Sequence, residues 1–175
     1  MGNNVSSLLA SRNRDEEVGS SPGCAREEGN MFETTRGGVD VGLSTRNIAA
    51  MKKFYTEALG LEEAAVIEVP GDFVRAAGFA KGGVKLHALK SGEVLIKLLE
   101  FADPPDSGDA LADSAAGFRY LTFWVKDMEA AVAHLRDAGV ELLSDILSRV
   151  PERKTIFFKD PDGNLLELNW VDPAV

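Results

Sequence analysis

Two histidines are the side chains best suited to transfer a proton near neutral pH. His87 lies in a β-rich run, residues 84–89, where alternation groups it with Lys85 and Leu89 on one face of a strand. If that face lines a cavity, His87 can bind a ligand or transfer a proton; the alternative is a structural role. His134 lies in a run of helical periodicity and is expected on a solvated helix surface. His87 is therefore a candidate ligand-binding residue.

Aromatic residues recur at alternate positions of a second β-rich run, residues 118–125. Successive strand residues point to opposite faces of a sheet, so one face carries Phe118, Tyr120, Thr122 and Trp124. The residues of the other parity are apolar and can supply the core. The pattern predicts an aromatic wall on which a planar or apolar ligand could stack, although core packing is the more common use of such a stripe.

The overall composition excludes several classes of protein. The 175 residues suit one domain or one pair of fused half-domains, and no apolar run is long enough to cross a bilayer. A net charge of -9 opposes binding to phosphate backbones, so we expect no nucleic-acid partner. The single cysteine, Cys24, cannot form an internal disulfide, and two histidines cannot build a Cys- and His-rich zinc site. A reducing, cytoplasmic location is therefore predicted.

Residues 1–30 are predicted to be a disordered tail, because they are rich in Ser, Asn, Gly, Arg and Glu and have no sustained apolar periodicity. Met1, Gly2 and Ser6 fit the pattern for N-myristoylation, in which Gly2 is the acylated residue. The alternative is an unmodified leader, since so short a pattern also matches by chance. One myristate chain would support only weak membrane association unless a second signal, such as acylation of Cys24, were added.

Residues 31–175 are predicted to form one domain with two copies of a strand, a helix and three strands. Alternating, β-branched runs predict strands, and apolar residues three and four apart predict helices. In the first module, about 38–101, the predicted strands are residues 39–45, 64–69, 84–89 and 94–101, with a helix at 48–59. A linker over 102–117 follows. In the second module, about 118–172, the predicted strands are residues 118–125, 140–143, 154–158 and 164–170, with a helix at 128–138.

The two modules are related by an internal repeat. Asn47 and Asp127, which lie 80 positions apart, are both suited to cap the N-terminus of a helix. Gly60 and Gly139 follow the two helices and can adopt the left-handed conformation that ends a helix. One supersecondary unit therefore occurs twice. Pairing the two units is expected to place the helices outside and to leave a cleft between the sheets.

Two strings of sequence resemble those of a known family. They are VGLSTRNIAAMKKFYTEALGLE, residues 41–62, and FFKDPDGNLLELNW, residues 157–170. Together with the repeat, they resemble the vicinal oxygen chelate superfamily, which includes glyoxalase I, extradiol dioxygenases and bleomycin-binding proteins. The resemblance covers about residues 38–172. It implies an α+β fold in which two tandem βαβββ modules form a curved mixed sheet with a central cleft and helices outside.

The resemblance also implies where the functional residues lie. In this family the first and fourth strands of each module each supply one metal ligand, and the matching positions here are Asp40, Lys97, Tyr120 and Glu167. Active members usually carry His, Gln or Glu there. Only Glu167 is a standard ligand, because Asp40 is short, Tyr120 would have to ionise and the Lys97 ammonium has no lone pair. We therefore expect no cofactor, with a divalent metal as the alternative.

Lys97 suggests a different use of these positions. Its ammonium could occupy the place of the metal and neutralise Asp40 and Glu167, whose charges would otherwise repel one another in a partly dry cleft. The alternative is that Lys97 is an ordinary exposed strand residue. On the last strand, alternation places Asn169 on the same face as Glu167. Asp40 and Asn169 are therefore candidate ligand-binding residues, as are Thr122 and the aromatic positions beside it.

Three functions are consistent with the resemblance. The first is a metal-independent protein that binds a small aromatic or carbonyl-containing molecule. The second is a metal-independent enzyme of the lyase, isomerase or dioxygenase type in which Glu167 is a general base and Lys97 or Tyr120 stabilises an enolate oxygen. The third is a metal-dependent glyoxalase-like lyase, isomerase or dioxygenase that uses Asp40, Glu167 and His87 or water. Since family members pair their modules within one chain or between two, a homodimer is an expectation alongside a monomer.

Overall fold

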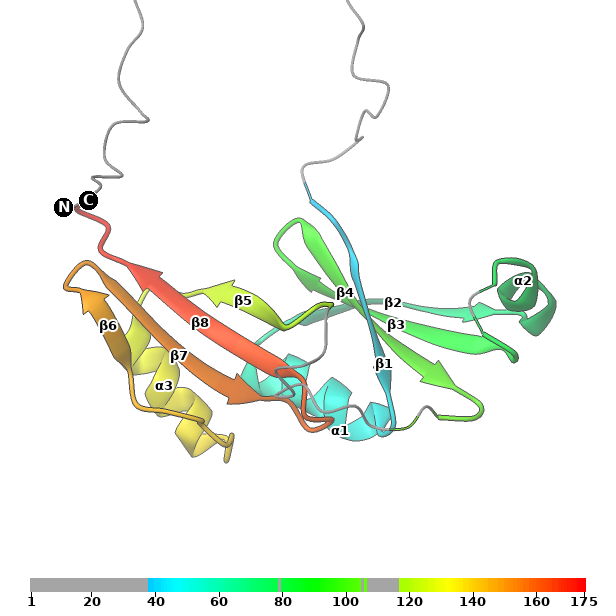
Figure 1. Ribbon diagram of the computed structural model, residues 1–175. Coiled ribbons are helices and arrows are strands. Elements are labelled where there is room, and N and C mark those ends of the chain that lie inside the picture. The colour runs from blue at the N-terminus through cyan, green and yellow to red at the C-terminus, as the bar shows by residue number, and fades with distance from the viewer. Residues whose placement is uncertain (1–37, 79, 105, 107–116) are drawn as a thin grey trace, which may run out of the picture. The chain divides into compact units, whose positions relative to one another are not determined.

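The computed structural model describes residues 38–78, 80–104, 106 and 117–175, which are coloured in Figure 1. The expectations for the tail over 1–30, for acylation of Gly2 and for Cys24 lie outside these residues, and so does most of the predicted linker. Within the described ranges, no helix has the length and apolar character required to cross a membrane.

The first module forms a four-stranded mixed sheet with the strand order β1-β4-β3-β2. Its elements in chain order are β1 (Val41–Thr45), α1 (Ile48–Lys53), the π-helix η1 (Phe54–Ala58), β2 (Glu62–Val69), α2 (Gly71–Ala76), β3 (Val84–Ser91) and β4 (Val94–Phe101). Strand β1 is parallel to β4, and the other neighbouring strands are antiparallel. The edges of this sheet are therefore β1 and β2.

The second module repeats this topology in a separate four-stranded sheet with the order β5-β8-β7-β6. Its elements are β5 (Tyr120–Trp124), α3 (Met128–Asp137), β6 (Leu147–Val150), β7 (Arg153–Lys159) and β8 (Leu165–Val171). Here β5 is parallel to β8, as β1 is to β4 in the first module. The predicted α+β fold of two tandem modules is confirmed, with two mixed sheets (Figure 1).

The predicted helix caps are confirmed in both modules. Asn47 Oδ1 accepts a hydrogen bond from the Ala50 amide at 3.1 Å, and Asp127 Oδ1 accepts one from the Ala130 amide at 2.9 Å. After the helices, Gly60 and Gly139 have φ angles of 69° and 75°, a conformation that costs L-residues free energy. The repeat seen in the sequence is therefore also a repeat of backbone geometry.

One predicted strand, residues 140–143, is wrong. Leu142 forms only an isolated bridge to Phe158, and the strand that pairs with β7 is β6. A short apolar run satisfies the pattern of a strand, but Leu142 packs against the core without continuing a ladder. The sequence of β6, LSRV, has no alternation, and α2 is only six residues long. Neither element therefore has a clear periodic signal.

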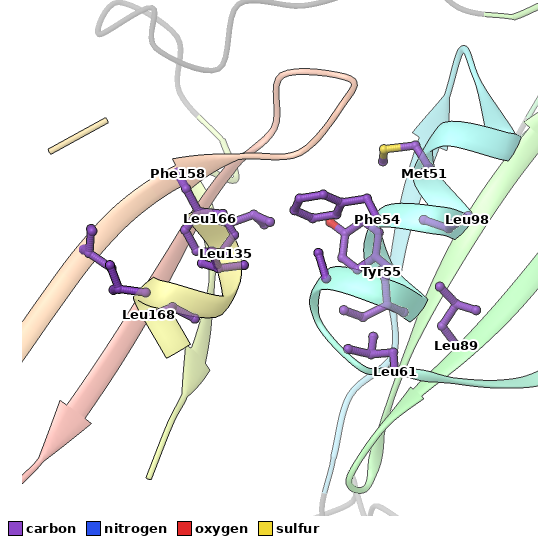
Figure 2. Close-up of a cluster of buried hydrophobic side chains, with 14 of the residues drawn as sticks. Met51, Phe54, Tyr55, Leu61, Leu89, Leu98, Leu135, Phe158, Leu166 and Leu168 are labelled. Carbon is purple, nitrogen blue, oxygen red and sulfur yellow. The ribbon is translucent and has the colours of Figure 1, made fainter. Parts of the chain in front are cut away.

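The larger of two hydrophobic clusters among the described residues contains side chains from both modules. From the first module it includes Met51, Phe54 and Tyr55, and from the second it includes Leu135, Phe158 and Leu166. The rings of Phe54 and Phe158 lie 6.4 Å apart between centroids, and Figure 2 shows Phe54 pointing toward the second module. Because Phe54 of η1 and Phe158 of β7 belong to the same buried cluster, burial of apolar surface links the two modules.

Candidate functional site

Glu167 on β8 is a buried carboxylate, with only 8% of the residue exposed. Its Oε2 accepts hydrogen bonds from Thr122 Oγ1 at 2.6 Å and from Asn169 Nδ2 at 3.0 Å. Its Oε1 accepts one from Thr155 Oγ1 at 3.0 Å. Three uncharged donors from β5, β7 and β8 therefore hold the carboxylate in one orientation.

Strand register places these donors around Glu167. Thr122 is the partner of Glu167 across β5 and β8, and Phe157 is its partner across β7 and β8. The neighbours of Glu167 along β8 point to the opposite face, where Leu166 and Leu168 belong to the core. We call the exposed side the Glu167 face, and it carries Tyr120, Thr122, Trp124, Thr155, Phe157, Glu167 and Asn169.

Exposed aromatic rings surround the polar centre of the Glu167 face. Tyr120 is 50% exposed and Trp124 is 68% exposed, on either side of Thr122 along β5. The ring of Tyr120 meets that of Phe157 edge-on, with centroids 5.7 Å apart and planes at 83°. Phe118 is fully exposed and precedes β5 rather than lying on it. The aromatic wall is thus made by Tyr120, Trp124 and Phe157, without Phe118.

Lys97 on β4 forms an ion pair with Asp40, with 2.8 Å between Nζ and Oδ2. The other oxygen of Asp40 accepts a hydrogen bond from the Leu95 amide at 3.3 Å. Side-chain exposures of 33% for Lys97 and 17% for Asp40 place the pair partly out of water. Lys97 points away from the core, because its strand neighbours Ile96 and Leu98 belong to the core on the other face.

Only part of the proposed counterion arrangement is present. Lys97 neutralises Asp40, but among the described residues no ion pair joins Lys97 to Glu167. Glu167 instead receives the hydroxyl and amide donors of its own sheet. The two carboxylates are therefore stabilised separately, one by a charge and one by neutral dipoles.

The structure separates His87 from Lys97. His87 pairs in register with Leu98, whereas Lys97 pairs with Ala88, so the two side chains lie on opposite faces of the sheet. His87 is buried and its Nε2 lies 2.9 Å from Glu100 Oε2. Its Nδ1 is buried without a hydrogen-bond partner. His87 therefore shares the face of Leu89 and Leu98, and it does not join the Lys97 pair as a ligand-binding group.

The donors at the four family positions do not fit a divalent metal. The Lys97 ammonium has no lone pair and occupies one oxygen of Asp40, and Tyr120 presents a phenol at an exposed position. Both oxygens of Glu167 already accept hydrogen bonds. Over the described ranges, no group of three His, Cys, Asp or Glu side chains is placed to hold a metal ion. These residues are therefore arranged as an ion pair and a hydrogen-bonded carboxylate.

A cavity of about 950 Å³ lies apart from these residues, beside η1, α3 and the turn before β8. Its lining includes Phe54, His134 and Asp160, and it includes neither Lys97 nor Glu167. The exposed position of His134 on α3 agrees with its predicted place on a helix surface. The candidate site residues therefore belong to open sheet faces and not to this cavity.

The turn between β7 and β8 connects the two modules through polar contacts. Asp160 accepts hydrogen bonds from the Asp162 and Asn164 amides, from Asn164 Nδ2 and from the Tyr55 hydroxyl, the last at 3.1 Å. Asp162 accepts hydrogen bonds from the Thr45 hydroxyl and the Arg46 amide. Burial and the adjacent Asp160 raise the pKa of Tyr55 well above its ordinary value, so the phenol keeps its proton and donates.

The same turn predicts a pH dependence of stability. Burial raises the pKa of Asp160 above its ordinary value of 3.8, against the opposing effect of hydrogen bonds from Asn164 and Tyr55. Between the ordinary and the raised pKa, the folded protein binds more protons than the unfolded chain, so stability falls as pH rises through this window. We expect the wild type to lose stability relative to Asp160→Asn when urea unfolding is measured from about pH 3 to pH 7. A difference independent of pH would contradict this assignment, and Asp145→Asn, at an exposed position, is the control.

Two residues of the Glu167 face, Thr155 and Phe157, were not predicted from the sequence. Both lie on β7 with the parity opposite to Ile156 and Phe158, which are buried in the core. Alternation within residues 154–158 carries this signal, because the polar and aromatic positions of one parity face away from the apolar positions of the other. The register of β7 against β8, which brings them to Glu167, comes from the fold.

This chain is similar to known proteins in both sequence and fold. The model of the Glyoxalase/Bleomycin resistance protein/Dioxygenase superfamily matches residues 39–168. The Escherichia coli protein YaeR is 30% identical over 128 residues, which cover 73% of this chain and 91% of YaeR. The Bacillus subtilis protein YwkD is 34% identical over 88 residues, which cover 50% of this chain and 67% of YwkD.

Solved structures agree with this assignment. A glyoxalase family protein from Bacillus cereus superimposes with a TM-score of 0.69 at 21% identity, covering 81% of this chain and 97% of that protein. TnmS3, an antibiotic binding protein from Streptomyces, superimposes with a TM-score of 0.53 at 22% identity, covering 79% of this chain and 99% of TnmS3. The family match spans both modules, and the chain belongs to the Glyoxalase/Bleomycin resistance protein/Dioxygenase superfamily.

Proposed function

We propose that this protein binds a small molecule on the Glu167 face without a metal ion. The observation that carries the proposal is the combination of an oriented, buried carboxylate with exposed aromatic rings beside it. Pockets for small molecules typically combine apolar and aromatic surface with a few fixed polar groups. Tyr120 and Trp124 supply the aromatic surface, and Glu167 with its hydrogen-bond donors supplies the fixed polar group.

The hydrogen bonds that Glu167 accepts favour a binding function over catalysis. A general base must accept a proton from its substrate through a lone pair that is within reach. In Glu167 both oxygens already accept hydrogen bonds, from Thr122 and Asn169 on one side and from Thr155 on the other. Three of its about four lone pairs are therefore used within the protein, and the one that remains on Oε1 can accept a hydrogen bond from a bound group.

Independence from metal is proposed from the Lys97–Asp40 pair. Two of the four positions that hold a metal elsewhere in the family are joined here by a 2.8 Å ion pair. A cation that displaced the ammonium would have to break this pair and leave Lys97 partly buried without its partner. TnmS3, described as an antibiotic binding protein, supports the proposal to the extent that a chain of this fold can serve as a binder.

Trp124 provides a test of the proposed function by fluorescence. The purified full chain is titrated with a library of planar aromatic fragments in the presence of EDTA. Fragments that bind the Glu167 face are expected to change the emission of Trp124, because a stacked ring alters its exposure to water. The change should disappear in Trp124→Phe and persist in Trp170→Phe, since the indole of Trp170 is bonded to the Lys126 carbonyl on the other side of the sheet.

Three results would contradict the proposal. A fluorescence response that persists in Trp124→Phe would place the ligand elsewhere. A response that requires added Zn²⁺, Ni²⁺ or Mn²⁺ would support the metal-dependent alternative instead. Conversion of a bound fragment, followed by NMR under the same conditions, would favour the metal-independent lyase or isomerase over a binding protein.

A further inference from the structure

The charge of Glu167 has no partner in its own sheet. The carboxylate is nine-tenths buried, and its three hydrogen-bond donors are two hydroxyls and one amide. Among the described residues, no lysine, arginine or histidine forms an ion pair with it. Buried charges in proteins are usually paired with an opposite charge, because neutral donors orient a carboxylate but leave its net charge uncompensated.

The lysines considered as partners of Glu167 form ion pairs with other carboxylates, and two further basic residues of β7 lie at its ends. Lys97 is paired with Asp40, and Lys154 is paired with Glu129 at 2.6 Å on the opposite face of β7. Arg153 and Lys159 share the parity of Thr155 and lie at the two ends of β7, in register with residues at the ends of β8. The centre of the Glu167 face, between β5 and β7, is therefore negative.

The rings around Glu167 favour a cation at the same place. Phe157 is the cross-strand partner of Glu167, and the ring of Tyr120 packs edge-on against the ring of Phe157. Trp124 lies on the other side of Thr122, on the same face of β5. The face of an aromatic ring carries negative electrostatic potential, so an organic cation is attracted both by the rings and by the carboxylate. An anion would be repelled by Glu167 and by the faces of the rings.

From this arrangement we infer that the ligand of the Glu167 face is an organic cation, namely a quaternary ammonium or protonated amine attached to a planar ring. The ammonium lies over the carboxylate of Glu167 and against the faces of the Trp124 and Tyr120 rings, and the planar ring of the ligand packs beside it on the same face. The net charge of -9 favours the approach of such a ligand from solution. This inference rests on the proposed function, because it names the class of molecule that the same face binds.

A pair of isosteric probes tests the role of charge. Benzyltrimethylammonium is a cation. Neopentylbenzene has the same shape but is neutral, because a carbon atom stands in place of the nitrogen. Calorimetric titration of the full chain is expected to give at least about tenfold tighter binding of the cation, in line with a desolvated cation–π contact and an ion pair. Glu167→Gln is expected to lower the affinity for the cationic probe roughly tenfold and to change the affinity for the neutral probe less than about twofold.

Two further variants serve as controls, one for the loss of a negative charge and one for failure of Glu167→Gln to fold. Glu141→Gln removes the same charge from an exposed position and should leave both affinities within about twofold of the wild type. Trp124→Leu alters an exposed side chain, so it should fold normally and reduce the preference for the cation by several-fold. If Glu167→Gln does not fold, the Trp124→Leu result alone decides whether this face selects a cation.

The outcomes separate the inference from the proposed function. Equal binding of the two probes to the wild type, or tighter binding of the neutral probe, would overturn the inference while leaving a binding function in place. Failure of both probes to bind would also overturn the inference, and the fluorescence screen with Trp124 would then decide the proposed function separately. A preference for the cation that survives in both Glu167→Gln and Trp124→Leu would place cation binding at another site.

Discussion

Replacing Asp160 by alanine is expected to lower the free energy of unfolding by about 2–4 kcal/mol. The side chain is buried, accepts four hydrogen bonds and connects the turn before β8 to Tyr55 in the other module. Alanine would leave the Tyr55 hydroxyl buried without an acceptor and would release the turn from its side-chain cap. Urea unfolding followed by circular dichroism measures the loss.

Two other variants separate the parts of this effect. Tyr55→Phe removes only the hydroxyl that crosses between the modules, so it is expected to cost about 1–2 kcal/mol. Asp145→Ala changes an exposed carboxylate with a weak 3.9 Å contact to Arg136 and should stay within about 0.5 kcal/mol of the wild type. An effect of Asp160→Ala no larger than that of Asp145→Ala would show that the turn does not connect the modules energetically.

Replacing Phe158 by alanine is expected to cost about 3–5 kcal/mol. Phe158 on β7 is completely buried and belongs to the core that both modules share, with its ring next to that of Phe54 (Figure 2). Alanine would remove this contact and leave a cavity between the modules. Domains of this size have a total stability of about 5–15 kcal/mol, so the variant should unfold at much lower urea concentration.

The exposed Phe73 on α2 is the control for this substitution. Its side chain is 66% exposed, so Phe73→Ala should change stability by no more than about 0.5 kcal/mol. Phe158→Leu retains most of the buried apolar surface and should fall between the two. If Phe158→Ala lowered stability only as much as Phe73→Ala, the shared core would contribute little to joining the modules.

Local patterns in the sequence were sufficient to predict most of the repeated module, with the exception of α2 and β6. Strand alternation and helical spacing depend on neighbours within a few residues, and so do the caps formed by Asn47 and Asp127. The same alternation correctly grouped Thr122 with Tyr120 and Asn169 with Glu167. These features are determined by the chain itself, because the period of a strand or helix decides which side chains share a face.

Contacts between distant segments were decided only in the tertiary structure. The sequence led us to expect that Lys97 would neutralise both Asp40 and Glu167. That Lys97 pairs with Asp40 while Glu167 receives hydroxyl and amide donors depends on how β1, β4 and β8 are placed. The opposite faces of His87 and Lys97 depend on the register of β3 against β4. Parity within one strand is local, but register and packing between strands are set by burial of the shared core, which no single segment specifies.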